Sequence, residues 1–255
     1  MSFLYPVKKK AIPLGRDKKQ IAGWVKSSKF SNGFYGFLKI ICSIFFKVFY
    51  RLEVIGAENV PKEGGVIVAA NHVSYLDPPV IGVALKRQPT YMAKEGLFKI
   101  PLLGALIRLF SFPVRRGRPQ PSIIKEAIKK LKQGELIVMF PEGSRSVDGN
   151  ILDAKRGVGA IAAISRMPVV PTLIKGTERA LPVGARFLRP ARITVIFGNP
   201  IVIDKKETDK HFQDRISNSI MEAIKNLKGK EQRAKSKGQK TLCSMLFALG
   251  SMLIQ

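Results

Sequence analysis

Short apolar runs alternate with amphipathic segments through the middle of the chain. Uninterrupted apolar runs bounded by turn residues predict buried strands at 66–70 and 136–140, and the mostly apolar segments 169–174 and 192–197 predict two more. Apolar residues at helical spacing predict a helix capped by Ser122 and ended by Gly134, and a closing amphipathic helix over 212–227. Because strands alternate with helices, the pattern predicts an α/β fold whose sheet is largely parallel and covered on both faces.

A different pattern precedes this region. Residues 34–50 read FYGFLKIICSIFFKVFY, in which seven aromatic residues are interrupted by Lys39 and Lys47. A membrane-spanning helix needs ~20 apolar residues, and the 17 residues here would reach only about 25 Å as a helix. The segment therefore favours a helix that lies in the membrane interface or enters one leaflet. A helix packed within the protein core is the alternative interpretation.

These patterns divide the chain into four parts. Residues 1–33 are basic, interrupted by proline and glycine, and lack the pattern of a secretory signal. We predict a membrane-associated helix over 34–51 and a folded α/β domain over 52–227. Residues 228–255 comprise a basic linker and an uncharged apolar tail from 241, which is either a second interfacial segment or a tail without fixed structure.

The net charge narrows the choice of partner. Lys and Arg number 44 against 18 Asp and Glu, which leaves a formal charge of +26. Such a charge indicates a polyanionic partner: nucleic acid, an anionic membrane surface or an acidic protein. With two cysteines and two histidines in the whole chain, a disulfide framework and a cysteine- or histidine-rich metal centre are not expected.

The first candidate for chemistry is NHVSYLD at 71–77, directly after the predicted strand at 66–70. Asp77 can accept a hydrogen bond from one ring nitrogen of His72, which leaves the other nitrogen free to take a proton from a hydroxyl near neutral pH. In the alternative interpretation, His72 merely ends the strand and Asp77 caps a helix that begins at Pro78.

Two further segments combine a rigid turn with cations. FPEGSRS at 140–146 follows another predicted strand and can present backbone N–H groups and an arginine to an anion. FPVRRGR at 112–118 holds three arginines, whose guanidinium groups match the oxygens of a phosphomonoester. Each segment alone could equally be a solvated surface turn.

In this order, with MAKEGLFKIPLLGAL at 92–106 and VVPTLIKG at 169–176, the segments are far more specific. The region 50–205 resembles the glycerolipid acyltransferase family, in particular its bacterial 1-acyl-sn-glycerol-3-phosphate acyltransferases. The resemblance implies a mixed sheet flanked by helices and an N-terminal helical motif in one membrane leaflet. It also implies acyl transfer from acyl-CoA or acyl-carrier protein to the 2-hydroxyl of lysophosphatidic acid, forming phosphatidic acid, without a cofactor.

The resemblance also assigns roles to residues. It makes His72 the base, Asp77 the group that orients it, and Arg116 the ligand of the acceptor phosphate. Arg115 stands where relatives often carry Asp, so the two arginines could share that phosphate. The other residues assigned to substrate binding are Lys94, Glu142, Gly143, Ser144, Arg145 and Pro171. Backbone N–H groups near Gly143 or at the start of the helix after Asp77 are candidates for binding the oxyanion.

Two alternatives remain open from the sequence. An enzyme with the same chemistry could use glycerol 3-phosphate or another lysophospholipid as acceptor. A basic module could instead bind lipid or nucleic acid without catalysis, although the chain shows neither RNA-reading aromatic motifs nor helix-turn-helix spacing, and we expect no nucleic acid partner. The expected location is the cytoplasmic face of the cell membrane.

Overall fold

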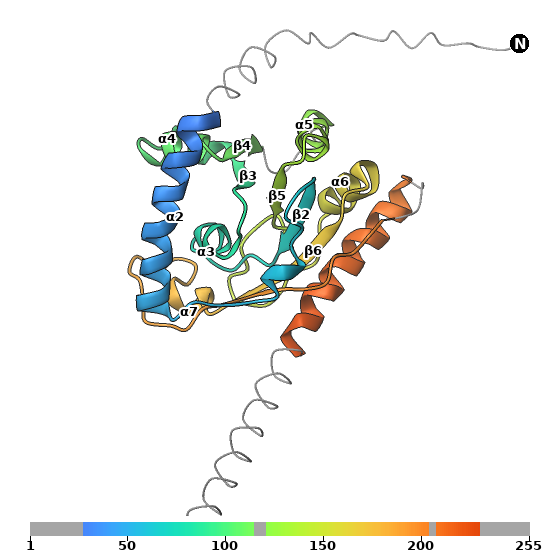
Figure 1. Ribbon diagram of the computed structural model, residues 1–255. Coiled ribbons are helices and arrows are strands. Elements are labelled where there is room, and N and C mark those ends of the chain that lie inside the picture. Colours follow the sequence, from blue (N-terminus) through green and yellow to red (C-terminus); the bar gives the residue numbers. More distant parts are fainter. Residues whose placement is uncertain (1–27, 115–120, 204–207, 230–255) are drawn as a thin grey trace, which may run out of the picture.

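The computed structural model describes residues 28–114, 121–203 and 208–229 (Figure 1). Its centre is a seven-stranded sheet with the strand order β1-β7-β6-β2-β5-β3-β4. The strands are β1 (Glu53–Ile55), β2 (Val66–Ala70), β3 (Pro89–Lys94), β4 (Ser111–Val114), β5 (Leu136–Met139), β6 (Val169–Lys175) and β7 (Thr194–Phe197).

The sheet is mixed but largely parallel, which confirms the predicted fold class. β2 occupies the middle and runs parallel to both β5 and β6, with Val68 opposite Val138 and Val170. β3 and β4 extend the parallel part beyond β5. Only β7 runs antiparallel to its neighbour β6 among the strands described.

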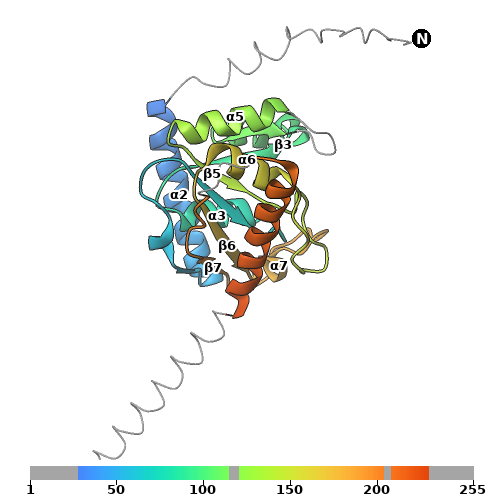
Figure 2. The same cartoon turned by 90° about the vertical axis from the view of Figure 1, so that its right-hand side faces the viewer.

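Helices cover both faces of the sheet (Figures 1 and 2). One face carries α2 (Ser28–Tyr50) and α3 (Asp77–Ala84), and the other carries α5 (Pro121–Lys132), α6 (Gly157–Ser165) and a helix over residues 210–229. Short elements complete the fold: η1 (Ala57–Asn59), η2 (Glu95–Lys99), α4 (Leu103–Arg108) and α7 (Thr177–Ala180).

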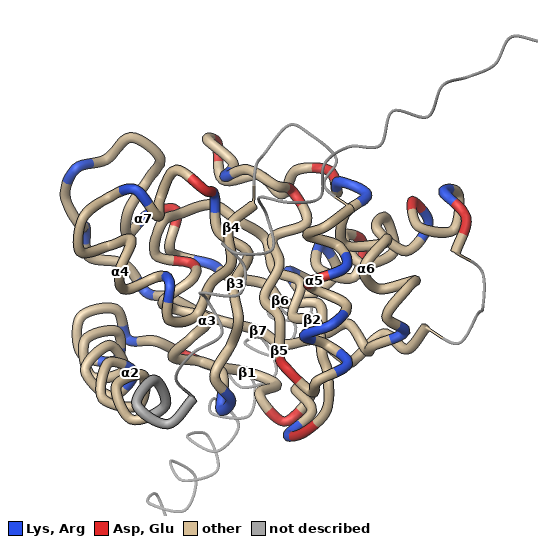
Figure 3. Tube along the Cα trace, turned by 90° about the horizontal axis from the view of Figure 1, so that it is seen from above, with Lys and Arg blue, Asp and Glu red and all other residues tan. Residues whose placement is uncertain are grey.

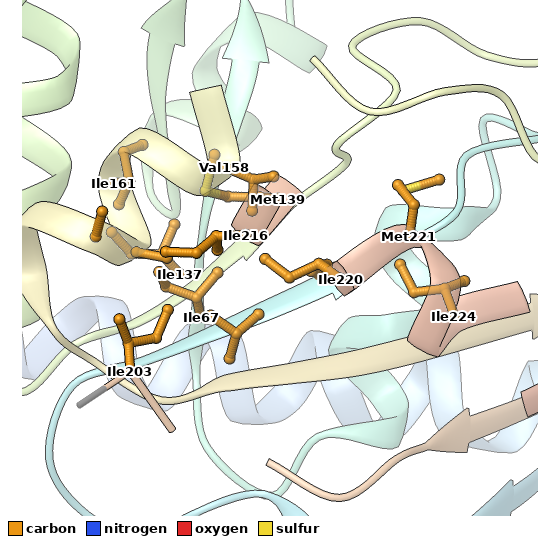
Figure 4. Close-up of a cluster of buried hydrophobic side chains, with 14 of the residues drawn as sticks. Ile67, Ile137, Met139, Val158, Ile161, Ile203, Ile216, Ile220, Met221 and Ile224 are labelled. Atoms are coloured by element: carbon orange, nitrogen blue, oxygen red, sulfur yellow. The ribbon is translucent and has the colours of Figure 1, made fainter. Parts of the chain in front are cut away.

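Alternation along the central strands divides the core into two parts. Ile67 and Ala69 of β2 pack toward α5, α6 and the 210–229 helix, whereas Val66, Val68 and Ala70 pack toward α2 and α3. Successive side chains of a strand point to opposite faces, so a run that is apolar at every position fits a sheet covered on both sides. Figure 4 shows the part of the core beneath α6 and the 210–229 helix.

All four predicted strands are present, and β7 begins at Thr194 rather than Arg192. The helix predicted from Ser122 begins one residue earlier, so Ser122 lies in its first turn and is not its cap. Proline is favoured at the first helical position because its fixed φ suits a helix. The sequence patterns missed β1, β3 and β4, which are short and largely half-buried.

The N-terminal helix is longer than predicted, because α2 begins at Ser28 and spans 23 residues. Its portion Gly33–Tyr50 is long and apolar enough, by length and composition alone, to cross a membrane. One stripe of the helix packs on the domain and includes Tyr35, Cys42, Phe46 and Tyr50.

The opposite stripe of α2 is apolar and exposed. It consists of Phe34, Phe37, Ile40, Ile41, Ile44, Val48 and Phe49. We call these seven residues the outer stripe of α2. Core packing is therefore confirmed for one side of the helix, and the membrane-interface interpretation stays a prediction for the other side.

Candidate active site

The predicted site segments meet at one edge of the sheet. β2, β5, β3 and β4 are parallel neighbours, so their carboxyl ends share this edge, where α/β proteins build their sites. Residues 71–76 follow β2, residues 140–146 follow β5, and Lys94 ends β3. β4 ends at Val114; Arg115 and Arg116, which come next in the sequence, lie outside the described residues.

His72 and Asp77 form the predicted pair. The Nδ1 of His72 lies 2.8 Å from Oδ2 of Asp77, and both residues are buried. An N–H at Nδ1 that donates to the carboxylate leaves Nε2 as the nitrogen able to accept a proton. The geometry is that of a base held in one tautomer.

The Asp77 carboxylate turns back toward the loop and does not cap α3. Its Oδ2 also accepts hydrogen bonds from the backbone N–H groups of Val73 (2.7 Å) and Ser74 (2.8 Å), while the cap position, Leu76, has no side-chain bond to the helix. Asp77 Oδ1 is buried without a hydrogen-bond partner among the described residues. The capping interpretation of Asp77 is therefore wrong.

Glu142 connects the two loops of the site. Its Oε1 accepts the backbone N–H of His72 at 2.9 Å, and its Oε2 accepts the N–H of Leu152 at 3.3 Å. Burial raises the pKa of Glu142 to about 7, and the nearby Asp77 carboxylate acts in the same direction, against the lowering effect of the two N–H donors. Glu142 thus fixes the backbone of His72 relative to the neighbouring loop.

Three further contacts join the same two loops. The backbone N–H of Ser146 donates to the carbonyl of His72 at 2.9 Å. The His72 ring stacks on Phe140 with 4.1 Å between ring centres. The Arg145 guanidinium lies 3.4 Å above the ring of Tyr75, a contact that leaves its N–H edges available to an anion.

The remaining predicted residues have different surroundings. Gly143 has φ +68°, and a Cβ there would lie 2.8 Å from the Lys155 side chain, so the turn requires glycine. Ser144 is half-buried, and Lys94 is exposed at the edge that carries His72. Pro171 is buried in the middle of β6, opposite Ala69 and against Gly198, so it is part of the sheet interior.

Two backbone groups considered for the oxyanion are already engaged. The N–H of Gly143 donates to the carbonyl of Phe140 at 3.0 Å, and the N–H of Asp77 donates to the carbonyl of Ser74 at 3.4 Å. In this conformation neither group is free to bind an oxyanion. Within the described ranges, no three His, Cys, Asp or Glu residues converge on a position that could hold a metal ion.

Sequence reasoning did not single out Asn71, Phe140 and Tyr75. The Asn71 side chain donates to the carbonyl of Ile174 (3.0 Å) and accepts its N–H (2.7 Å), which fixes the end of β2 to β6. All three residues lie inside the candidate segments 71–77 and 140–146, so the sequence did place them near the site. Their contacts depend on which loops the fold brings together.

The sequence is similar to those of known acyltransferases. The family described as Acyltransferase matches residues 51–175. A 1-acyl-sn-glycerol-3-phosphate acyltransferase of Bacillus subtilis is 34% identical over 152 residues, which cover 59% of this chain and 73% of that protein. A chloroplastic protein of the same name from Arabidopsis thaliana is 32% identical over 168 residues, 64% of this chain and 47% of the relative.

The fold also matches a solved structure. The crystal structure of the 1-acyl-sn-glycerophosphate acyltransferase PlsC from Thermotoga maritima superposes with a TM-score of 0.62 at 28% sequence identity. The match covers 83% of this chain and 84% of that one. These similarities agree with the order of the site segments along the chain and with the His72–Asp77 geometry. The chain belongs to the acyltransferase family.

Proposed function

We propose that the protein transfers an acyl group from an acyl thioester to the 2-hydroxyl of 1-acyl-sn-glycerol 3-phosphate and so forms phosphatidic acid. The observation that carries the proposal is the buried His72–Asp77 pair at the sheet edge. The acceptor in the names of the Bacillus and Thermotoga relatives supports this choice of substrate.

The chemistry follows from the free ring nitrogen of His72. Nε2 takes the proton of the acceptor hydroxyl as its oxygen attacks the thioester carbonyl, and the Asp77 carboxylate stabilises the imidazolium that forms. The tetrahedral intermediate collapses with cleavage of the C–S bond, and the imidazolium returns the proton to the thiolate. The donor is already activated and the transfer is redox-neutral, so we propose a reaction without a cofactor.

We assign the acceptor phosphate to the arginines predicted from the sequence. Arg116, with Arg115 beside it, follows β4, and Arg145 is held over Tyr75 in the neighbouring loop. Guanidinium groups bind phosphate oxygens through paired hydrogen bonds. Lys94, exposed at the end of β3, would add a cation for the phosphates of acyl-CoA or of the prosthetic group of acyl-carrier protein.

We propose that the protein lies on the membrane with α2 in the bilayer plane. Along its length α2 packs on the domain: Phe46 and Tyr50 are buried in the core, the Tyr35 hydroxyl donates to the carbonyl of Gly82, and the Lys39 amine donates to that of Leu85. A helix held lengthwise against a water-soluble domain cannot cross the bilayer without taking that domain with it. The outer stripe instead faces the acyl chains sideways.

The apolar surface continues beyond the N-terminal half of α2. Tyr35 contacts Phe110 edge to face, and near this contact Ile100, Leu102 and Leu103 are exposed between η2 and α4. Since acyl-CoA and acyl-carrier protein are thioesters of the cytoplasm, we place this surface on the cytoplasmic face of the cell membrane.

The test combines product identification with a matched pair of variants. Purified protein is given vesicle-borne lysophosphatidic acid and each thioester donor in turn, and the product is identified by mass. We expect His72→Ala to lower turnover by at least ~10²-fold, the scale of a positioned general base. His211→Ala is the control, because His211 is exposed on the 210–229 helix.

The outcomes separate the candidates. Equal turnover by wild type and His72→Ala would refute the mechanism. Product formed only from glycerol 3-phosphate, or from a lysophospholipid without a phosphomonoester, would keep the chemistry and change the acceptor. No product from any acceptor, with vesicle binding intact, would favour a non-catalytic lipid-binding protein.

A further inference from the structure

The loop after α7 connects the candidate site with the flank that carries α2. At its start, the Ser74 hydroxyl donates to the carbonyl of Leu181 at 2.8 Å. The N–H of Arg189 donates to the carbonyl of Ala180 at 2.8 Å and closes the loop on itself. After the loop, the N–H of Ile193 donates to the carbonyl of Tyr50, the last residue of α2.

The tip of this loop carries two exposed apolar side chains. Phe187 is 81% exposed and Leu188 is 49% exposed. Arg186 precedes this pair and Arg189 follows it, and both arginines are exposed. The loop therefore places two large apolar side chains between two cations. This combination suits the boundary between acyl chains and anionic head groups.

The position of the loop indicates the same partner. In Figure 1 the segment after α7 lies on the same flank of the molecule as the C-terminal end of α2, opposite the 210–229 helix. The view from above agrees, because the loops next to α7 extend to the same side of the molecule as α4 and α2 (Figure 3). The apolar tip thus extends the surface formed by the outer stripe of α2, and its cations complement an anionic bilayer.

The inner part of the loop borders the site. A small pocket is lined by Val73, the residue after His72, by Ser146, and by Pro182 and Val183 of this loop, with the acidic Asp148 and Glu178 also in its wall. A lipid that leaves the bilayer at the loop tip would meet this wall at Val73, the neighbour of His72 in the chain.

We propose that residues 181–189 form a second bilayer contact, in which Phe187 and Leu188 enter an anionic leaflet beside α2 and the same loop forms the bilayer-facing rim of the acceptor site. This inference rests on the membrane association proposed above. It adds a loop outside the sequence segments that carry the family resemblance, and it makes access to His72 depend on how the loop meets the lipid.

The experiment measures partition into phosphatidylglycerol vesicles by sedimentation. Two large apolar side chains contribute on the order of 10- to 100-fold to partition, so Phe187→Ser/Leu188→Ser is expected to bind vesicles at least ~10-fold more weakly. The matched control is Val202→Ser, an exposed apolar residue near the 210–229 helix, on the opposite flank. Val202→Ser should bind vesicles and acylate the acceptor as wild type does.

Tryptophan fluorescence tests directly whether the loop tip enters the bilayer. Trp24 is the only tryptophan of the chain, so Trp24→Phe gives a background for single tryptophans. Phe187→Trp is expected to be quenched by brominated phosphatidylglycerol, like Phe37→Trp on the outer stripe, whereas Asn218→Trp on the 210–229 helix is not. Positions 37, 187 and 218 are exposed, so tryptophan at each of them is expected to leave the fold intact.

Several results would overturn the inference. One is unchanged vesicle partition of the double variant, and another is quenching at position 37 without quenching at position 187. A tip that responds to an acidic carrier protein and not to vesicles would make the loop a protein-docking surface instead. Failure of wild type to acylate any acceptor would refute the proposed function, while partition and quenching would still decide the role of the loop.

Discussion

At the residue scale, the site depends on how one carboxylate oxygen is shared. Asp77 Oδ2 accepts from the His72 ring and from two backbone N–H groups, while Oδ1 has no hydrogen-bond partner among the described residues. In Asp77→Asn, the amide oxygen can accept all three hydrogen bonds only if it takes the place of Oδ2. The amide NH₂ group then takes the place of Oδ1, which has no hydrogen-bond partner among the described residues. The variant therefore buries two unsatisfied donors and loses the charge that stabilises the imidazolium.

We expect Asp77→Asn to lower kcat by about 10²- to 10⁴-fold and the free energy of unfolding by about 1–3 kcal/mol. Steady-state kinetics on a vesicle-borne acceptor and denaturant unfolding measure the two effects. A fully active variant with unchanged stability would show that the carboxylate neither orients the ring nor needs its charge.

Glu142 gives a prediction about pH. Its folded pKa of about 7 is above the ordinary value of 4.5, so the folded state binds the proton more tightly than the unfolded state does. The stability from this group is complete below pH ~4.5 and is lost as the pH rises through about 7. Glu142→Gln does not titrate, so the stability of wild type relative to the variant should fall across this window, by up to about 3 kcal/mol.

Urea unfolding of both proteins at pH 4.5, 6 and 8 measures this difference, because the other titrating groups are common to both. A difference that stays constant with pH would mean that the Glu142 carboxyl titrates normally. The variant should also lose turnover, since an amide has only one acceptor oxygen for the N–H groups of His72 and Leu152.

The residue types and spacing of the site were predictable from the sequence, but the partners of Glu142 were not. The His72–Asp77 pair was anticipated because five residues after a strand end can form one turn. Glu142 was assigned to substrate, whereas the residue is 2% exposed and its carboxylate accepts hydrogen bonds from backbone donors. Burial of a polar side chain depends on which loops meet, and a local pattern does not contain that information.

At the element scale, apolar runs identified the strands that are buried on both faces. β2, β5 and β6 are buried along almost their whole length; β2 and β5 are apolar at every position, and β6 is apolar except at Thr172 and Lys175. β3 and β4, at one end of the sheet, have mostly half-buried positions and a weaker pattern. In α2, aromatic residues on both stripes hid the difference between its two sides, because core packing and lipid contact select the same residue types.

The two stripes of α2 make opposite predictions. Phe46→Ala, on the inner stripe, should lower the free energy of unfolding by about 3–5 kcal/mol, as expected for a buried Phe. The triple variant Phe37→Ser/Ile41→Ser/Ile44→Ser, on the outer stripe, should change it by less than ~1.5 kcal/mol in total, since exposed substitutions have small effects.

Vesicle binding should show the reverse order. The triple variant should lose most of its partition into phosphatidylglycerol vesicles, while folded Phe46→Ala should keep it. Strong destabilisation by the triple variant would mean that the outer stripe packs on protein. These substitutions are a sharper test than removal of residues 1–50, which would also strip Phe46 and Tyr50 from the core.

At the scale of the whole molecule, the proposed membrane association combines two features, the formal charge of +26 and the outer stripe of α2. The electrostatic attraction to an anionic bilayer is screened by salt, since the Debye length falls from ≈10 Å at 0.1 M to 3 Å at 1 M. Burial of apolar side chains in the leaflet is not screened. Salt should therefore remove the electrostatic contribution to binding and leave the apolar contribution.

We expect 1 M NaCl to weaken wild-type partition into phosphatidylglycerol vesicles without releasing the protein completely. The same salt should release the triple outer-stripe variant, whose remaining attraction is largely electrostatic. Neutral phosphatidylcholine vesicles provide the converse control, because they keep the apolar contribution and lack the charge. Complete release of wild type by salt alone would show that α2 only touches the head groups, and the in-plane insertion of its outer stripe would then be refuted.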